Sequence, residues 1–378
     1  MKINVVNISS WLLIITLPFA NITKLIGIED GFSRVTIALL MFFLSINFCQ
    51  KLKINLTFLS YVFFILISTM ILNIALDNIV FTDGLFNIFK TIVFIFLIDI
   101  LDRNDHILHH FLTRYYQVYL FSLFISLVIY LLFPMPEFVF YDGSENRFGG
   151  LHFELYNFMF STILFYVSWL YNGRNNFVGF ILMLVLMLFA RSNIFFLYML
   201  LFILIYLFRG FLIKKYFTSL IIISIVLSPM LIGLFLDYLG ILNQLSVRSV
   251  SSFDSNGSAL YIRLYPFALA AQHILESGWA ALLPMGIGYF ENSELVINDP
   301  LSYGGTGSPK AVIDLGIIIF LFVTVFIAKK FHQNISGLTD DAQIIYSILF
   351  FPCLIYISFG AGFLNIVAWF CILASVNF

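Results

Sequence analysis

The chain carries a succession of apolar segments, each long enough to cross a lipid bilayer as a helix. Roughly twelve can be marked, because the hydrocarbon core of a bilayer needs about 20 apolar residues per helix. They lie near residues 8–26, 32–49, 56–76, 85–101, 115–134, 151–170, 176–190, 192–208, 217–237, 311–328, 342–359 and 361–376. Backbone polar groups in lipid must be satisfied within the segment itself, so these segments should be helices. The sequence therefore predicts an all-α polytopic membrane protein.

The composition agrees with this class and excludes others. Hydrophobic residues make up 61% of the chain and charged residues only 10%, far from the balance of a soluble domain. The formal net charge is -1 at pH 7 and no basic face stands out, which argues against a nucleic-acid partner. Cys49, Cys353 and Cys371 all fall in predicted spans, where a thiol behaves as a small hydrophobe, so we expect no disulfide, no metal centre and no cofactor.

The loops between the spans alternate in charge. Basic residues occupy one set of loops, at Lys51, Lys53, Arg103, Arg114, Arg174, Arg209, Lys214, Lys215, Lys329 and Lys330. The opposite set carries Glu29, Asp30, Asp77, Asp83, Glu137 and Asp142. The positive-inside rule makes the basic set cytoplasmic, so both termini are expected inside and the long loop outside.

The segment 239–310 is the only long stretch that is not apolar enough to span. The predicted organisation is therefore spans in 1–238, a large outer loop in 239–310, and further spans in 311–378. A loop this long is uncommon unless it is functional or disordered. It mixes apolar, aromatic and charged residues, so we expect it to be folded and close to the chemistry. No internal repeat is visible, unlike the two-fold organisation of many secondary transporters.

Within this loop, SALYIRLYPFALAAQHILESG is predicted to form an amphipathic helix. Ser258 fits an N-cap and Gly278 a stop, while Pro266 either kinks the helix or starts a second one. A helix of this kind can rest on the membrane over a cavity between spans. The following PMGIGYF has no strand-turn-helix context and is predicted to be a turn.

Several basic residues are left once the cytoplasmic ones are set aside. They are Lys24, Arg34, Lys90, Arg147, Arg191, Arg248, Arg263 and Lys310. Arg191 joins two apolar runs and lies either toward a polar cavity or at headgroup phosphate in a turn. Arg263 faces the same cavity or is a solvated surface residue, and Lys310 contacts a phosphate or anchors the interface.

The stretch ENRFGGLHFELYNF precedes the sixth predicted span. Glu154 there either stabilises the helix N-terminus or orients a sugar hydroxyl and acts as general base. His152 is a polar helix-end residue or a substrate contact. In the long loop, His273 and Glu276 can pair at a spacing of three residues, which we favour over a metal site. Tyr265 either stacks on a sugar or anchors the interface.

Arginine is suited to phosphate, because its planar guanidinium stays charged and binds bidentately. Outside the cytoplasm there is no ATP, so the phosphate that these residues meet is expected to be a lipid-linked diphosphate. Preorganised cations can stabilise such a leaving group electrostatically.

These residues also carry a family resemblance. The Arg191 hairpin, RFGGLHFE, and RLYPFALAAQHILESGWAALLPMGIGYF followed by GSPKAVIDLGIIIF resemble the O-antigen polymerase and O-antigen ligase superfamily. The resemblance covers roughly residues 147–320 and implies a GT-C-like glycosyltransferase of the bacterial inner membrane that uses undecaprenyl-diphosphate sugars. It implies that Arg191 and Arg263 are the essential arginines. The ligase branch has a histidine where this chain has Lys310, which favours the repeat-unit polymerase.

The resemblance implies a lipid-linked donor and acceptor as substrates and a chain-length regulator as protein partner. Arg191 and Arg263, helped by Arg147, Arg248 and Lys310, would hold the donor diphosphate. A lipid-linked oligosaccharide flippase is the main alternative, although it should show two comparable halves. An O-antigen ligase stays open as well, whereas an acyltransferase or a cell-wall polymerase should have an acidic or histidine signature in a span.

Overall fold

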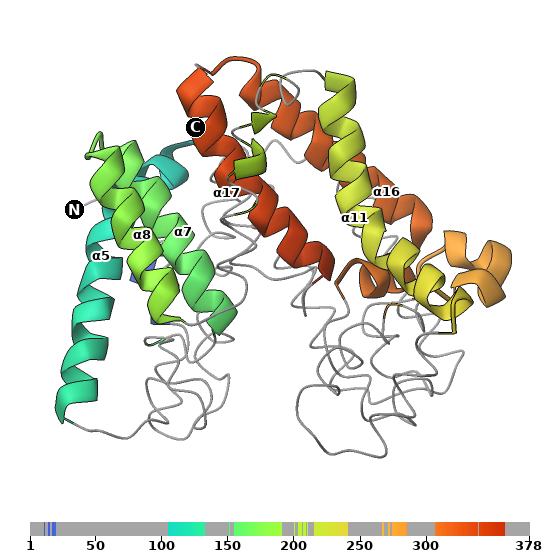
Figure 1. Cartoon of the computed structure of the whole chain (residues 1–378), viewed down its shortest axis with the longest axis horizontal. Coiled ribbons are helices and arrows are strands. Elements are labelled where there is room, and N and C mark those ends of the chain that lie inside the picture. The colour runs from blue at the N-terminus through green and yellow to red at the C-terminus, as the bar shows by residue number, and fades with distance from the viewer. Residues whose placement is uncertain are drawn as a thin grey trace, which may run out of the picture.

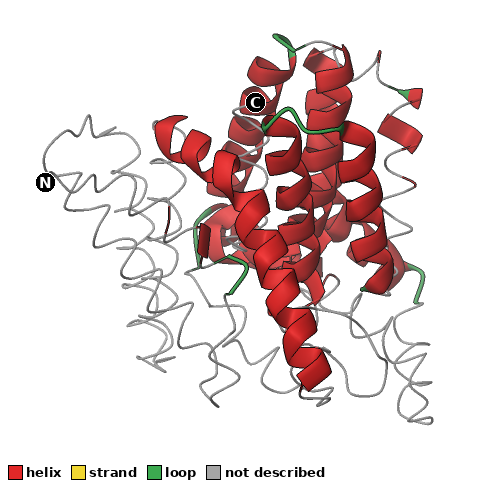
Figure 2. Cartoon of the chain, turned by 90° about the vertical axis from the view of Figure 1, so that its left-hand side faces the viewer, coloured by secondary structure: helices red, strands yellow, loops and turns green. Residues whose placement is uncertain are grey.

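The structure is a computed structural model. It describes residues 105–132, 155–190, 215–240, 274–285, 307–338 and 340–359, with short pieces near 11–19, 151, 200–210 and 267–272. Within these residues every regular element is helical, as Figure 2 shows. The prediction of an all-α chain is therefore confirmed for the described part.

The six long helices coincide in place with six of the predicted spans. They are α5 (Asp105–Leu132), α7 (Leu155–Tyr171), α8 (Asn176–Phe189), α11 (Lys215–Tyr238), α16 (Gly307–Ile335) and α17 (Asp340–Phe359), with the short 3₁₀ helix η3 (Gly278–Leu282). The start of α8 has a local cause, because the Asn175 side chain accepts hydrogen bonds from the Phe177 and Val178 backbone amides.

Two helices extend well past the predicted apolar runs. α5 begins at Asp105 rather than near 115, and α16 covers 307–335 rather than 311–328. Hydropathy marks only the part of a helix that fits lipid, whereas backbone hydrogen bonding continues into the polar flanks. The last residues of the predicted outer loop, 307–310, thus already belong to α16.

Three of these helices are long and apolar enough to cross a membrane, at His109–Ile129, Thr218–Leu236 and Ala311–Gln333. Shorter apolar stretches lie at Phe158–Tyr171 and Asn176–Phe189. The predicted spans 32–49, 56–76, 85–101 and 361–376 lie outside the described residues, as do most of 8–26 and 192–208. The described part is thus helical with membrane-spanning character, and the total of about twelve spans stays a prediction.

The helices form two groups that stand side by side in Figure 1. In one group α7 packs against α5 and α8, and in the other α11, α16 and α17 pack against one another. α7 and α17 provide the contact between the groups. The α7–α8 turn, the start of α11 and the α16–α17 turn lie toward the same edge of the molecule, the upper one in Figure 1.

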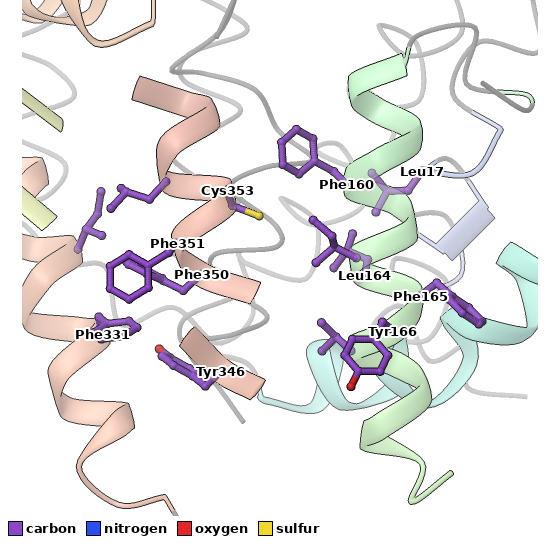
Figure 3. Close-up of a cluster of buried hydrophobic side chains, with 14 of the residues drawn as sticks. Leu17, Phe160, Leu164, Phe165, Tyr166, Phe331, Tyr346, Phe350, Phe351 and Cys353 are labelled. Atoms are coloured by element: carbon purple, nitrogen blue, oxygen red, sulfur yellow. The ribbon is translucent and has the colours of Figure 1, made fainter. Parts of the chain in front are cut away.

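Aromatic side chains fill much of the core. Phe331 of α16 packs on Phe350 and Phe351 of α17, with ring centroids 4.3 and 5.4 Å apart. Figure 3 shows these rings on one side of the cluster and Phe160 and Leu164 of α7 on the other. In lipid there is little hydrophobic gain when helices associate, so close packing of this kind is a main source of stability.

Candidate functional site

Most of the predicted site residues lie outside the described residues. These are Arg147, His152, Glu154, Arg191, Arg248, Arg263, Tyr265 and His273. Lys310 is placed by its backbone, in the first turn of α16. Whether the arginines converge on a single cavity therefore stays a prediction.

The described part of the site is built around a break in α16. Gly316 has φ 74° and ψ 154°, so α16 consists of a short helix before Gly316 and a longer one after it. Only glycine adopts such a backbone without strain. The predicted span at 311–328 coincides with the candidate span Ala311–Gln333, and the break within it was not predicted, because hydropathy does not report the conformation of a single glycine.

The described end of the 239–310 loop packs directly against this break. The Met285 backbone amide donates a hydrogen bond to the Ile313 carbonyl over 3.2 Å. Next to it, the backbone of Leu283 and Pro284 lies so close to Gly316 that a Cβ atom on the glycine would stand 2.5–2.7 Å from three of their atoms. The break in α16 and the path of the loop therefore depend on each other. The break frees the Ile313 carbonyl from helical hydrogen bonding, and the Met285 amide of the loop satisfies it.

The same part of the loop is fixed by its inward side chains. The Phe267 ring meets the Phe359 ring at the end of α17, with centroids 6.0 Å apart. Ala271, Ala281 and Pro284 are buried as well. Residues 271–272 and 274–277 are helical, as predicted, and Gly278 with φ 53° turns the α-helix into η3. The expected stop at Gly278 is confirmed.

The short first helix of α16 carries a residue that sequence reasoning missed. Asp314 is only 3% exposed and lies two residues before the break, one turn after Lys310. An acidic residue within a membrane span is costly and usually marks a functional site. The available signal was the lone Asp in SPKAVIDLGIIIF, which falls in a predicted span.

Ser308 adds a buried hydroxyl to the same helix. Its side chain is fully buried, and among the described residues its Oγ has no hydrogen-bond partner. Such a group calls for a water or a ligand. The N-terminus of a helix also attracts anions. Proline at position 309 is compatible with this first turn, because the backbone N–H that it lacks would have no partner within the helix. This turn of α16 therefore combines features that suit an anionic ligand.

A second polar cluster lies where α5 meets the α7–α8 turn. The Arg174 guanidinium donates to the Tyr116 hydroxyl over 3.2 Å, and the Asn172 amide donates to the Leu112 carbonyl over 3.0 Å. His109 Nδ1 is hydrogen-bonded to the Tyr171 hydroxyl. These groups satisfy one another, so we interpret the cluster as a structural link between the helices.

No group of three or more His, Cys, Asp and Glu side chains that could hold a metal occurs within the part of the chain that the structure describes. Cys353 is buried and free. The expectation of chemistry without a metal or cofactor rests on the sequence.

Comparison with known proteins adds no relative. No family model, no curated protein and no solved structure matches this chain. The function therefore has to be argued from the residues, from the break in α16 and from the loop that packs on it.

Proposed function

We propose that this protein is a membrane glycosyltransferase that polymerises undecaprenyl-diphosphate-linked oligosaccharide repeats, at the outer face of a bacterial inner membrane. Both termini would be cytoplasmic and the 239–310 loop periplasmic. The donor would be the growing glycan on its carrier and the acceptor a single lipid-linked repeat.

The observation that carries the proposal is the loop packed on the break in α16. Irregular backbone at membrane depth is tolerated where it is buried in protein or lines a polar cavity. Here the break is joined to a buried acid, Asp314, and to the segment that follows Arg263 and His273 in the sequence. A polar site at this place could be reached both from the lipid and from the outer loop.

In the proposed reaction an acceptor hydroxyl attacks the anomeric carbon of the donor sugar. The bond from that carbon to the diphosphate oxygen breaks, and the carrier diphosphate leaves with its electron pair. Arg191 and Arg263 would stabilise this leaving group, assisted by Arg147, Arg248 and Lys310. Glu154 would accept the hydroxyl proton or orient the hydroxyl.

The first helix of α16 supports the leaving-group part of this proposal. Its N-terminus, the buried Ser308 hydroxyl and the position of Lys310 together suit a phosphate group. The Ser308 hydroxyl and the first backbone amides of α16 are hydrogen-bond donors, as electrostatic stabilisation of a diphosphate requires.

A lipid-linked oligosaccharide flippase is the second candidate, because broken helices near a substrate site are also common in transporters. An O-antigen ligase would use the same donor and differ only in its acceptor. In all of these cases the substrate is a lipid-linked diphosphate sugar.

Reconstitution separates the candidates. Purified protein in liposomes, supplied with lipid-linked repeats, lipid A core and no ion gradient, should lengthen the glycan. Transfer of repeats between leaflets without lengthening would identify a flippase, and glycan added only to lipid A core would identify a ligase. Arg263→Ala should abolish lengthening, and a full ladder of glycan lengths from that variant would remove Arg263 from the mechanism.

A further inference from the structure

The described end of the outer loop exposes three large apolar side chains, which we call the stripe. Leu275 lies in the last α-helical turn, Trp279 in η3 and Leu283 directly after η3, and they are 67%, 87% and 56% exposed. Ala281 and Pro284 of the same segment are buried, and η3 packs against α16. The segment is thus apolar on both sides, which is unsuited to a loop surrounded by water.

The packing on α16 fixes the depth of this stripe. The candidate span begins at Ala311, and Gly316 follows it by five residues. At about 1.5 Å per residue along the short helix before the break, Gly316 lies roughly 5–8 Å inward of the outer end of the span. Leu283 touches Gly316 and Met285 is bonded to Ile313, so this part of the loop lies at the same depth.

We infer that residues 274–285 form a half-immersed element, in which Leu275, Trp279 and Leu283 contact the lipid of the outer leaflet. The depth set by Gly316 agrees with the roughly 5–10 Å to which interfacial helices bury their apolar side. Tryptophan is a preferred residue at the boundary between headgroups and acyl chains. The partner of this surface is therefore the bilayer itself.

The charges of the segment define how it binds lipid. Glu276 is the only ionisable side chain among residues 274–285, and it is exposed. Residues 274–285 contain no lysine or arginine that could bind anionic headgroups. Burial of apolar surface must therefore supply the free energy with which this segment enters the lipid.

Immersion of residues 274–285 would assist the proposed function, and it can be tested independently of that function. If the protein acts on a lipid-linked diphosphate, an immersed loop brings its polar residues to the level where the diphosphate emerges from the lipid. The immersion itself can be measured with no substrate present.

The test uses full-length protein with Cys49→Ser and Cys371→Ser, in which the buried Cys353 is retained. One new cysteine, Trp279→Cys or Leu283→Cys, carries a polarity-sensitive fluorophore in phosphatidylcholine nanodiscs. Nitroxide-labelled lipids and aqueous iodide then compete as quenchers. Glu276→Cys is the matched control from the same segment, and Val325→Cys, exposed within the span of α16, reports the lipid interior.

We expect labels at 279 and 283 to be quenched by nitroxide near the top of the acyl chain, at about 5–10 Å below the phosphates. The label at 276 should be quenched more by iodide, and the label at 325 by deeper nitroxide. Iodide quenching at 279 and 283 equal to that at 276 would overturn the inference, because the stripe would then lie in water. Protection from both quenchers would overturn it too, since protein would then cover the stripe. Immersed labels in a protein that lengthens no glycan would refute the proposed function alone.

Discussion

Gly316 of α16 lies so close to Leu283 of the 239–310 loop that a Cβ atom on the glycine would stand 2.5 Å from the Leu283 carbonyl carbon. The contact joins residues that are 33 positions apart in the chain. It depends on a glycine for two reasons, the space and the positive φ of 74°. The loop cannot pack on α16 in this way with any larger residue at position 316.

Gly316→Ala should therefore weaken the packing of the loop. The strained backbone alone costs about 1–3 kcal/mol, and the clash with Leu283 adds to it. We expect a lower unfolding free energy and faster hydrogen exchange at the Met285 amide, which would lose its bond to Ile313. Hydrogen exchange followed by mass spectrometry measures the second effect directly.

Gly337→Ala is the matched control, because an added Cβ there meets nothing within 4 Å. Its unfolding free energy should change by less than about 1 kcal/mol. Equal behaviour of the two variants would contradict the importance of the Gly316 contact.

Asp314→Asn keeps the shape of the side chain and replaces its carboxyl group by an amide. Because an acidic residue within a membrane span usually marks a functional site, we expect glycan lengthening to slow by about a hundredfold. The unfolding transition of the purified variant separates this effect from a loss of folded protein. Glu276→Gln, which alters an exposed carboxylate of the loop, should keep its rate. Full activity of Asp314→Asn would show that the charge has no part in the reaction.

α5 and α7 are joined inside the apolar region by a hydrogen bond between Tyr119 and Thr162, whose oxygens are 2.7 Å apart. The Thr162 hydroxyl also donates to the Phe158 carbonyl, so its proton is in use and Tyr119 must be the donor. Tyr119→Phe and Thr162→Val should each destabilise the protein, and a double-mutant cycle should give a coupling of about 0.6–2 kcal/mol. Unfolding in mixed detergent micelles measures it, and strictly additive losses would contradict the bond.

The proposed topology places the end of α11 outside and the end of α16 inside. Tyr238 is 88% exposed and Ser336 is exposed too, so a cysteine at either position should react freely. In cells with a permeabilised outer membrane, an impermeant maleimide should label Tyr238→Cys, and Ser336→Cys only after lysis. The reverse pattern would invert the orientation that the basic loops predict.

The sequence alone was enough to predict which segments of the described part are helices, because the length and apolarity of a segment are properties of that segment by itself. α8 was predicted at 176–190 and is found at Asn176–Phe189, and α17 was predicted at 342–359 and is found at Asp340–Phe359. The end of the loop helix at Gly278 was also readable, since a glycine stop is a local signal.

Only the tertiary structure decided where α16 breaks and what lies against the break. The conformation of Gly316 depends on Leu283 and Pro284, and no local pattern in IDLGIIIF contains them. The burial of Asp314 is likewise not readable from its neighbours in the sequence. The length of an apolar run indicates which segments enter lipid. The place of the loop against α16 depends on contacts between segments that are distant in the sequence, and these contacts exist only once the chain has folded.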